Sequence, residues 1–273
     1  MPTFVDKVRT VDLLEAEFAA LDGLCSGLAA DQWDLATCLP GWTVRDVLSH
    51  IIGTEAMLAG DPAPVADTSH LHHMRNPVAE ANEVWVESMR PLGGVEVLAR
   101  FRQVVTRRLE ALASMTQADF DAPSWTPAGR DETYGRFMRI RHFDCFLHEH
   151  DIRDAVGGPV RPEAEALDSA LDEVATGLGY IVGRRAALPD GSRVLVELSG
   201  PAPRTFRVAV EGRAALVDSF DGPPTVGVGM SAMEFLRLTG GRRDLHQVDP
   251  DPIRYSGDRA LGEQLVSNLA FTI

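Results

Sequence analysis

The stretch LPGWTVRDVLSHIIG, residues 39–53, places a turn directly before a helix that carries a histidine on its apolar side. Pro-Gly-Trp-Thr has the composition of a turn, and Thr43 is a predicted N-cap, with Asp46 three residues later near the positive end of the helix. The helix is predicted over about 44–58. His50 lies at the edge of its apolar arc, where an ionisable ring needs an explanation.

The segments around this helix repeat the helical period of three and four residues. They predict further helices over 3–29, 78–92, 94–115 and 134–156, with a break at 91–94. The stretch 59–77 reads as a long loop and 121–133 as a turn-rich connection. This content is typical of a four-helix bundle.

The pattern changes after Pro162, where alternating apolar residues and turn signals predict antiparallel strands. The predicted strands are 192–200, 204–212 and 214–220, with possible additions at 224–230 and 251–257, and the predicted helices are 163–185, 231–241 and 260–271. A chain of 273 residues fits two domains, which we expect at 1–160 and 161–273. The predicted fold class is therefore a two-domain α+β protein, with a helical bundle followed by a smaller α+β domain containing an antiparallel sheet.

Composition and charge exclude several classes of partner. The formal net charge of −14 opposes nucleic acids and anionic membrane surfaces. No run is long and apolar enough for a membrane span, and the N-terminus carries acids where a secretory signal carries basic residues, so a cytoplasmic protein is expected. The cysteines, Cys25, Cys38 and Cys145, lack metal-site spacing and are predicted to be buried apolar residues.

The predicted helix over 134–156 carries Asp144 and His148 four residues apart, and therefore on one face. Such a pair can hold one ion, and His50 on a facing helix could supply a third ligand. Two imidazoles and a carboxylate leave a coordination position open, as in catalytic zinc sites. Spacing alone leaves the alternative of a buried histidine and a solvated Asp–His contact.

Other ionisable residues near these helices are assigned lesser roles. His142 and His150 point away from the Asp144/His148 pair on an ideal helix, and Glu149 and Asp151 are surface or supporting residues, with Asp151 able to orient His148. The loop histidines His70, His72 and His73 could bind a metal, guard the cavity or be solvated, and the last is expected. There is no GxSxG, Walker or HExxH motif.

Three motifs together resemble the mycothiol-dependent maleylpyruvate isomerase family, within the wider DinB-like metalloenzyme superfamily. They are LPGWTVRDVLSHI, DCFLHEHDIRDAVG and the terminal SGDRALGEQLVSNLAF, which span both halves of the chain. The resemblance implies a DinB-like four-helix bundle that holds a divalent ion, usually zinc, and a C-terminal domain similar to sterol-carrier-like folds. It places the metal ligands at His50, Asp144 and His148. The acidic ligand is Glu in many members and the shorter Asp144 here.

The family resemblance also implies a thiol cosubstrate, mycothiol, the low-molecular-weight thiol of actinobacteria. The arginine-rich, lysine-poor composition is compatible with such a source. The resulting hypothesis is that the ion activates mycothiol as a metal-bound thiolate, which adds to a small electrophilic substrate. The outcome of this addition is either isomerisation of the substrate or S-transfer. Arg75, Arg139 and Arg141 are candidate anchors for a substrate carboxylate, although solvated arginines are commoner.

Two other functions remain open from the sequence. A metal-bound water would make the protein a hydrolase without a thiol requirement. A small-molecule binding module would use a cavity in the C-terminal domain, with the metal structural or absent. The expected partners are a small-molecule substrate and a thiol, and the chain is expected to be a monomer or homodimer.

Overall fold

The structure is a computed structural model that describes residues 2–71, 77–161, 163–243 and 253–272. The chain divides into two compact units, Met1–Arg161 and Pro162–Ile273. The first unit is helical and contains the residues of the predicted metal site, and the second combines helices with a sheet.

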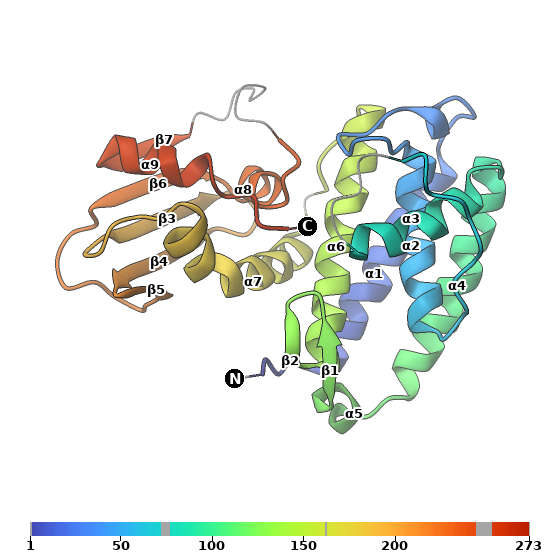
Figure 1. The fold of residues 1–273 in the computed structure, drawn as a ribbon, viewed down its shortest axis with the longest axis horizontal. Coiled ribbons are helices and arrows are strands. Elements are labelled where there is room, and N and C mark those ends of the chain that lie inside the picture. The colour runs from blue at the N-terminus through green and yellow to red at the C-terminus, as the bar shows by residue number, and fades with distance from the viewer. Residues whose placement is uncertain (1, 72–76, 162, 244–252, 273) are drawn as a thin grey trace. The chain divides into compact units, whose positions relative to one another are not determined.

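Four long helices form the frame of the first unit (Figure 1). They are α1 (Lys7–Ser26), α2 (Val44–Leu58), α4 (Gly94–Ser114) and α6 (Tyr134–Val156). Each of α1 and α2 packs against both α4 and α6, so the four helices close around one apolar core. The predicted helical bundle is therefore confirmed.

The turn before α2 has the predicted cap. The Asp46 N–H donates to Thr43 Oγ1 at 3.3 Å, and the Thr43 N–H donates to Asp46 Oδ2 at 3.0 Å, so two backbone donors at the helix start are satisfied reciprocally. Gly41 adopts a φ of +81°, which glycine reaches without strain. This tight turn fixes the position of Trp42 one residue before the N-cap.

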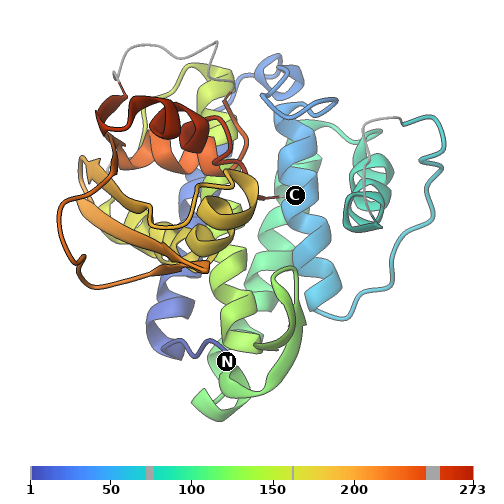
Figure 2. The same ribbon diagram turned by 60° about the vertical axis from the view of Figure 1, so that its left-hand side comes forward.

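Helix α3 (Pro77–Met89) lies on the outer side of α2 (Figure 2). The close approach depends on Gly53, because a Cβ at that position would lie 2.4 Å from the Cβ of Trp85. The predicted break between two helices is confirmed, since α3 ends at Met89 and α4 begins at Gly94.

Four short elements of the first unit were not predicted: η1 (Gln32–Asp34), α5 (Gln117–Asp121), β1 (Pro123–Thr126) and β2 (Gly129–Thr133). The stretch predicted as turn-rich thus contains an antiparallel hairpin. Its strands are too short to display the two-residue period that predicts a strand. Trp125 attaches the hairpin to α6 by an edge-on contact with Phe137, with ring centroids 6.0 Å apart.

The second unit begins with α7 (Ala164–Tyr180), which continues into the π-helical turn η2 (Ile181–Arg185). Five strands follow in the spatial order β5-β4-β3-β6-β7. The strands are β3 (Arg193–Ser199), β4 (Arg204–Glu211), β5 (Arg213–Leu216), β6 (Val226–Ser231) and β7 (Arg254–Gly257), and the remaining helices are α8 (Ala232–Thr239) and α9 (Arg259–Val266). The start of the predicted strand 251–257 lies outside the described residues.

The sheet of the second unit is antiparallel except for one neighbouring pair. The three strands predicted to be antiparallel, β3, β4 and β5, pair as expected, whereas β3 and β6 run parallel, a direction that the sequence did not indicate. Strand direction depends on the path of the connecting chain, and the apolar run of β6 does not reveal it. Helix α7 packs against β4 and β5, and α8 packs against β3 and β6. The α+β class of the chain is confirmed.

The three cysteines do not share one environment. Cys25 and Cys145 are buried on helices, as predicted, whereas Cys38 is exposed. The prediction of burial is wrong for Cys38 because this residue lies in the loop between η1 and α2 rather than on a helix face.

Within the described residues, no helix combines the length and apolar character needed to cross a membrane.

Charged side chains lie inside the first unit. Glu17 of α1 and Glu149 of α6 are both fully buried, and both contact the guanidinium of Arg161. Burial raises the pKa of Glu17 to about 8, and the nearby Glu149 carboxylate adds to this rise.

The raised pKa of Glu17 predicts a pH-dependent stability. Because the folded protein holds this proton more tightly than the unfolded chain, its contribution to the free energy of unfolding is complete below about pH 4.5 and is lost as the pH rises through about 8. Glu17→Gln keeps an acceptor for Arg161 without the titration. We expect the variant to gain on the order of a few kcal/mol relative to the wild type between pH 5 and pH 8.5 in urea unfolding. Parallel stability curves for the two proteins would contradict this.

Candidate metal centre

The three predicted ligands come together between α2 and α6. His50 Nε2 lies 3.3 Å from Asp144 Oδ2, and His148 Nε2 lies 3.5 Å from Asp144 Oδ1. The three potential ligand atoms lie within 4.8 Å of one another, and no second group of this kind occurs among the residues that the structure describes. The helical spacing of Asp144 and His148 places them on one face of α6, and the packing of α2 against α6 adds His50.

The two imidazoles are buried, with relative exposures of 5% for His50 and 4% for His148. The Asp144 side chain retains 30% of its exposure. The cluster is therefore reachable from solvent on the side of the carboxylate. The histidine on the apolar side of α2 is explained by this convergence, because its ring faces an acidic partner on α6.

The protonation states of two of these groups suit metal binding. Burial lowers the pKa of His50, and Asp144 opposes this only in part. Burial would raise the pKa of Asp144, but His148, Arg141 and His50 outweigh it and hold this pKa well below its usual range. A neutral imidazole and an ionised carboxylate are the forms that coordinate cations.

The second imidazole is oriented by Asp151, as the sequence interpretation allowed. Asp151 Oδ2 lies 2.9 Å from His148 Nδ1, and the carboxylate is buried. This partner assigns the ring proton to Nδ1, so that the lone pair of Nε2 faces Asp144. Burial alone would lower the pKa of His148, but the carboxylates of Asp144 and Asp151 outweigh it, so this pKa lies above its ordinary value.

This donor set fits a divalent cation. The lone pair of His148 Nε2 and the oxygens of Asp144 repel each other unless a proton or a cation lies between them. A proton can satisfy one such pair at a time, whereas a cation can be shared by both rings and the carboxylate. Two nitrogens and one oxygen also match the ligand types that zinc prefers.

Arg141 supports the acidic ligand. Its Nη1 donates to Asp144 Oδ2 at 2.5 Å, and its Nε donates to Glu55 Oε1 at 2.9 Å. Glu55 also accepts from Arg108 Nε at 3.0 Å, and Glu55, Arg108 and Arg141 are all buried. The expectation that Arg141 is solvated is therefore wrong, because two carboxylates from two helices occupy its guanidinium. Arg75, a further candidate anchor, lies outside the described residues.

An aromatic wall of the site was not recognised from the sequence. The ring centroid of Trp42 lies 5.1 Å from that of His50 and 6.1 Å from that of His148. Trp42 Nε1 donates to Glu83 Oε1 of α3 at 2.5 Å. The motif PGWT was interpreted only as a turn, and no spacing rule relates Trp42 to a carboxylate on a separate helix.

The other histidines that the structure describes lie apart from this cluster. His142 and His150 are buried elsewhere on α6, and burial lowers the pKa of His142 to about 3. Glu149 is also buried and pairs with Arg153 and Arg161, so its interpretation as a surface residue is wrong. His70 is exposed as expected, and His72 and His73 lie outside the described residues.

Comparison with known proteins identifies both parts of the chain. The model of the family described as "Mycothiol maleylpyruvate isomerase N-terminal domain" matches residues 14–153, and that of the corresponding C-terminal domain matches residues 168–264. Uncharacterised proteins from two strains of Mycobacterium tuberculosis are each 25% identical over 250 residues, which cover 91% of this chain and 91% of the relative.

Solved structures support the same fold. A crystal structure of the mycothiol-dependent maleylpyruvate isomerase aligns with a TM-score of 0.60 at 16% identity, covering 92% of this chain and 99% of the isomerase. A mutant of that isomerase aligns over the same shares with a TM-score of 0.59. At 16% sequence identity, this structural similarity shows a shared fold.

The ligand assignment predicts the metal content of variants. Purified His50→Ala, Asp144→Ala and His148→Ala should each retain less than about a tenth of the wild-type metal, because two protein ligands hold a dication much more weakly than three. His70→Ala is the matched control, since this histidine is exposed. Elemental analysis measures the outcome. Equal metal content in the wild type and all four variants would contradict the proposed ligand set.

The Asp151 contact predicts a smaller effect on the same site. Asp151→Asn removes the charge behind His148 while leaving the three ligands in place, so metal affinity should fall by about tenfold. Asp154→Asn, one turn away on the exposed side of α6, should leave affinity unchanged. Chelator competition with Co(II) gives both values. Equal losses in the two variants would mean that general helix charge, rather than the His148 contact, governs binding.

Proposed function

The chain belongs to the mycothiol maleylpyruvate isomerase family, and on this premise we propose that it is a metal-dependent enzyme that uses mycothiol as a thiol cosubstrate. In this proposal His50, Asp144 and His148 hold a divalent ion, which we take to be zinc. The observation that carries the proposal is the convergence of two imidazole nitrogens and one carboxylate between two packed helices.

A bound dication would lower the pKa of a coordinating thiol and so supply a thiolate nucleophile at neutral pH. The ligand set leaves room for an exogenous sulfur, because it provides three protein donors. Asp144 retains partial exposure, which supports entry of the thiol from this side. The buried helix faces behind the ligands restrict access from the core.

The charges around the site favour a monoanionic ligand. With both imidazoles neutral, as metal ligands must be, the charges of the groups packed about them sum to one negative charge; these groups are Arg108, Arg141, Glu55, Asp144 and Asp151. A dication changes this sum to one positive charge. A thiolate neutralises it, whereas a neutral ligand leaves an uncompensated charge among buried groups.

We propose isomerisation of a small unsaturated electrophile as the reaction, as the name of the solved relative suggests. The thiolate adds to an electrophilic carbon of the double bond, a carbon–sulfur bond forms, and the electron pair moves onto the conjugated acceptor. Rotation about the new single bond and return of the electron pair expel the thiolate, so mycothiol is regenerated. S-transfer would instead retain the carbon–sulfur bond and consume the thiol.

The thiol requirement also gives the proposed location of the enzyme. A thiol cosubstrate must stay reduced, which requires a reducing compartment such as the cytoplasm. The proposed partners are accordingly the thiol and a small electrophile.

Thiol titration of the cobalt-substituted protein tests the proposal. Adding mycothiol should produce a sulfur-to-cobalt charge-transfer absorption that saturates at one thiol per site, and maleylpyruvate should then isomerise without net loss of mycothiol. His148→Ala should lose both responses, because it removes a ligand. O-methylserine in place of the cysteinyl group gives a matched non-thiol control.

The other outcomes point to other functions. Turnover of an ester or amide that is unaffected by mycothiol would indicate a hydrolase with water at the ion. Accumulation of a stable thioether with loss of free thiol would indicate S-transfer. An unchanged cobalt spectrum at saturating thiol would overturn the proposed nucleophile.

A further inference from the structure

The indole of Trp42 contacts both histidines of the candidate metal centre. Its interplanar angles with the two imidazoles are similar, 37° with His50 and 38° with His148, while the two imidazoles meet edge to face with centroids 4.9 Å apart. Any rotation of the indole would therefore alter the space available to both rings. Trp42 itself comes from the turn before α2 and is only partly buried, so it needs a restraint of its own.

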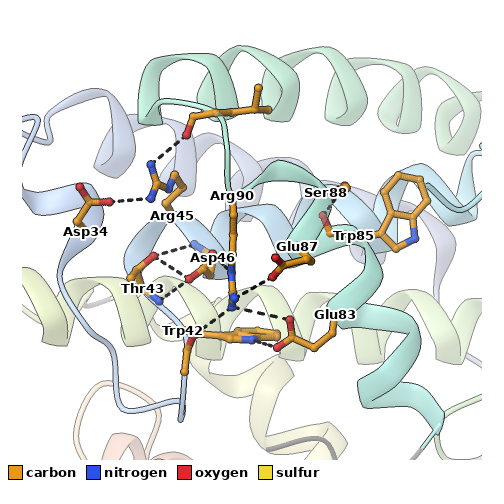
Figure 3. Close-up of polar contacts among 12 residues, drawn as sticks. Asp34, Trp42, Thr43, Arg45, Asp46, Glu83, Trp85, Glu87, Ser88 and Arg90 are labelled. Carbon is orange, nitrogen blue, oxygen red and sulfur yellow. Dashed lines mark hydrogen bonds and ion pairs between the residues drawn. The ribbon is translucent and has the colours of Figure 1, made fainter. Parts of the chain in front are cut away.

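That restraint comes from α3. The single hydrogen-bond donor of the indole, Nε1–H, meets Glu83 Oε1 at 2.5 Å, and Glu83 is only 1% exposed (Figure 3). Hydrogen bonds to an ionised acceptor are short and about twice as strong as neutral ones. The bond fixes the edge of the indole, and the position of that edge determines how the ring face meets the imidazoles.

Glu83 is in turn held by Arg90. The guanidinium of Arg90 lies among three carboxylates, with Nη2 3.9 Å from Glu83 Oε2, Nε 3.4 Å from Asp46 Oδ1 and Nη1 2.9 Å from Glu87 Oε2 (Figure 3). Arg90 Nη2 also donates to the carbonyl of Gly41, the residue before Trp42. One arginine thus joins α3 to the turn that carries the indole and to the cap of α2.

We propose that Glu83 is a positioning residue of the metal centre: it holds the Trp42 indole against His50 and His148 and thereby fixes the orientation of the two ligand rings. The inference rests on the proposed function, because it concerns the rings that bind the ion there. It extends the metal centre beyond α2 and α6 to a carboxylate on α3, the helix outside the bundle.

A purely structural role for Glu83 makes a different prediction. Helix α3 also contacts α2 through Trp85, which packs over Gly53. Because that contact does not involve Trp42, α3 can remain attached when the indole bond is broken. If Glu83 served only to attach α3, replacing Glu87, the other α3 carboxylate that contacts Arg90, would affect the imidazoles and metal binding as much as replacing Glu83 does.

The experiment compares Glu83→Ala, Glu83→Gln and the matched control Glu87→Ala in the full chain. Glu87 shares Arg90 with Glu83, but the hydrogen bond of the indole N–H goes to Glu83. Two readouts are used: the imidazole resonances of His50 and His148 in the metal-free protein, and the Co(II) dissociation constant with its absorption spectrum. Trp42→Phe, which keeps an aromatic ring but lacks the N–H, serves as a second variant if Glu83→Ala does not fold.

Glu83→Ala should shift both imidazole resonances, weaken Co(II) binding by about tenfold and change the cobalt spectrum. Glu83→Gln should restore most of the wild-type behaviour, because its amide oxygen still accepts the indole N–H. Glu87→Ala should match the wild type in both readouts. Trp42→Phe should resemble Glu83→Ala.

Unchanged resonances and affinity in Glu83→Ala would overturn the inference, as would equal changes in Glu83→Ala and Glu87→Ala. The metal-free resonances separate this result from a failure of the proposed function. If the wild type binds no Co(II), the proposed function fails, and the imidazole shifts alone decide whether Glu83 and Trp42 position the rings.

Discussion

The first unit is organised around the carboxylate of Asp144, which faces the Nε2 atoms of two imidazoles from two helices. A carboxylate and an imidazole nitrogen whose lone pair faces it repel each other unless a proton or a cation lies between them. Arg141 contributes to that requirement from one side through Asp144 Oδ2. This electrostatic requirement accounts for the polar side chains that occupy facing positions on α2 and α6, where apolar packing would otherwise be expected.

The same requirement organises the surroundings of the site. Asp151 fixes the proton of His148 on the nitrogen that points away from Asp144. Glu55 accepts hydrogen bonds from both buried arginines, Arg108 and Arg141, and so holds Arg141 beside Asp144. Each of these groups would be unfavourable if buried alone, and each is satisfied by a neighbour on another turn or another helix. The polar interior is therefore a connected network and not a set of isolated ion pairs.

Sequence reasoning succeeded where the relevant information is local. The period of three and four residues predicted α2 and α6, and the four-residue spacing of Asp144 and His148 placed both on one face. Whether these residues bind a metal stays a prediction. The hairpin of β1 and β2 was missed because strands this short lack a visible period, and the parallel β3–β6 pair depends on the path of the chain. Glu83 could not be connected with Trp42, since 41 residues separate them and their contact exists only after α3 packs on α2.

The acidic position shows which long-range contacts hold a short carboxylate side chain between the two helices. Aspartate is one methylene shorter than the glutamate that the family resemblance implies for many members, and a shorter side chain on the same helix reaches less far toward α2. In this chain both oxygens of Asp144 nevertheless lie within 3.5 Å of an imidazole nitrogen. Arg141, one turn earlier on the same helix, binds Oδ2 and is itself held by Glu55 of α2. The buried Glu55–Arg141 pair therefore links the two helices at the level where the shorter acid faces both rings.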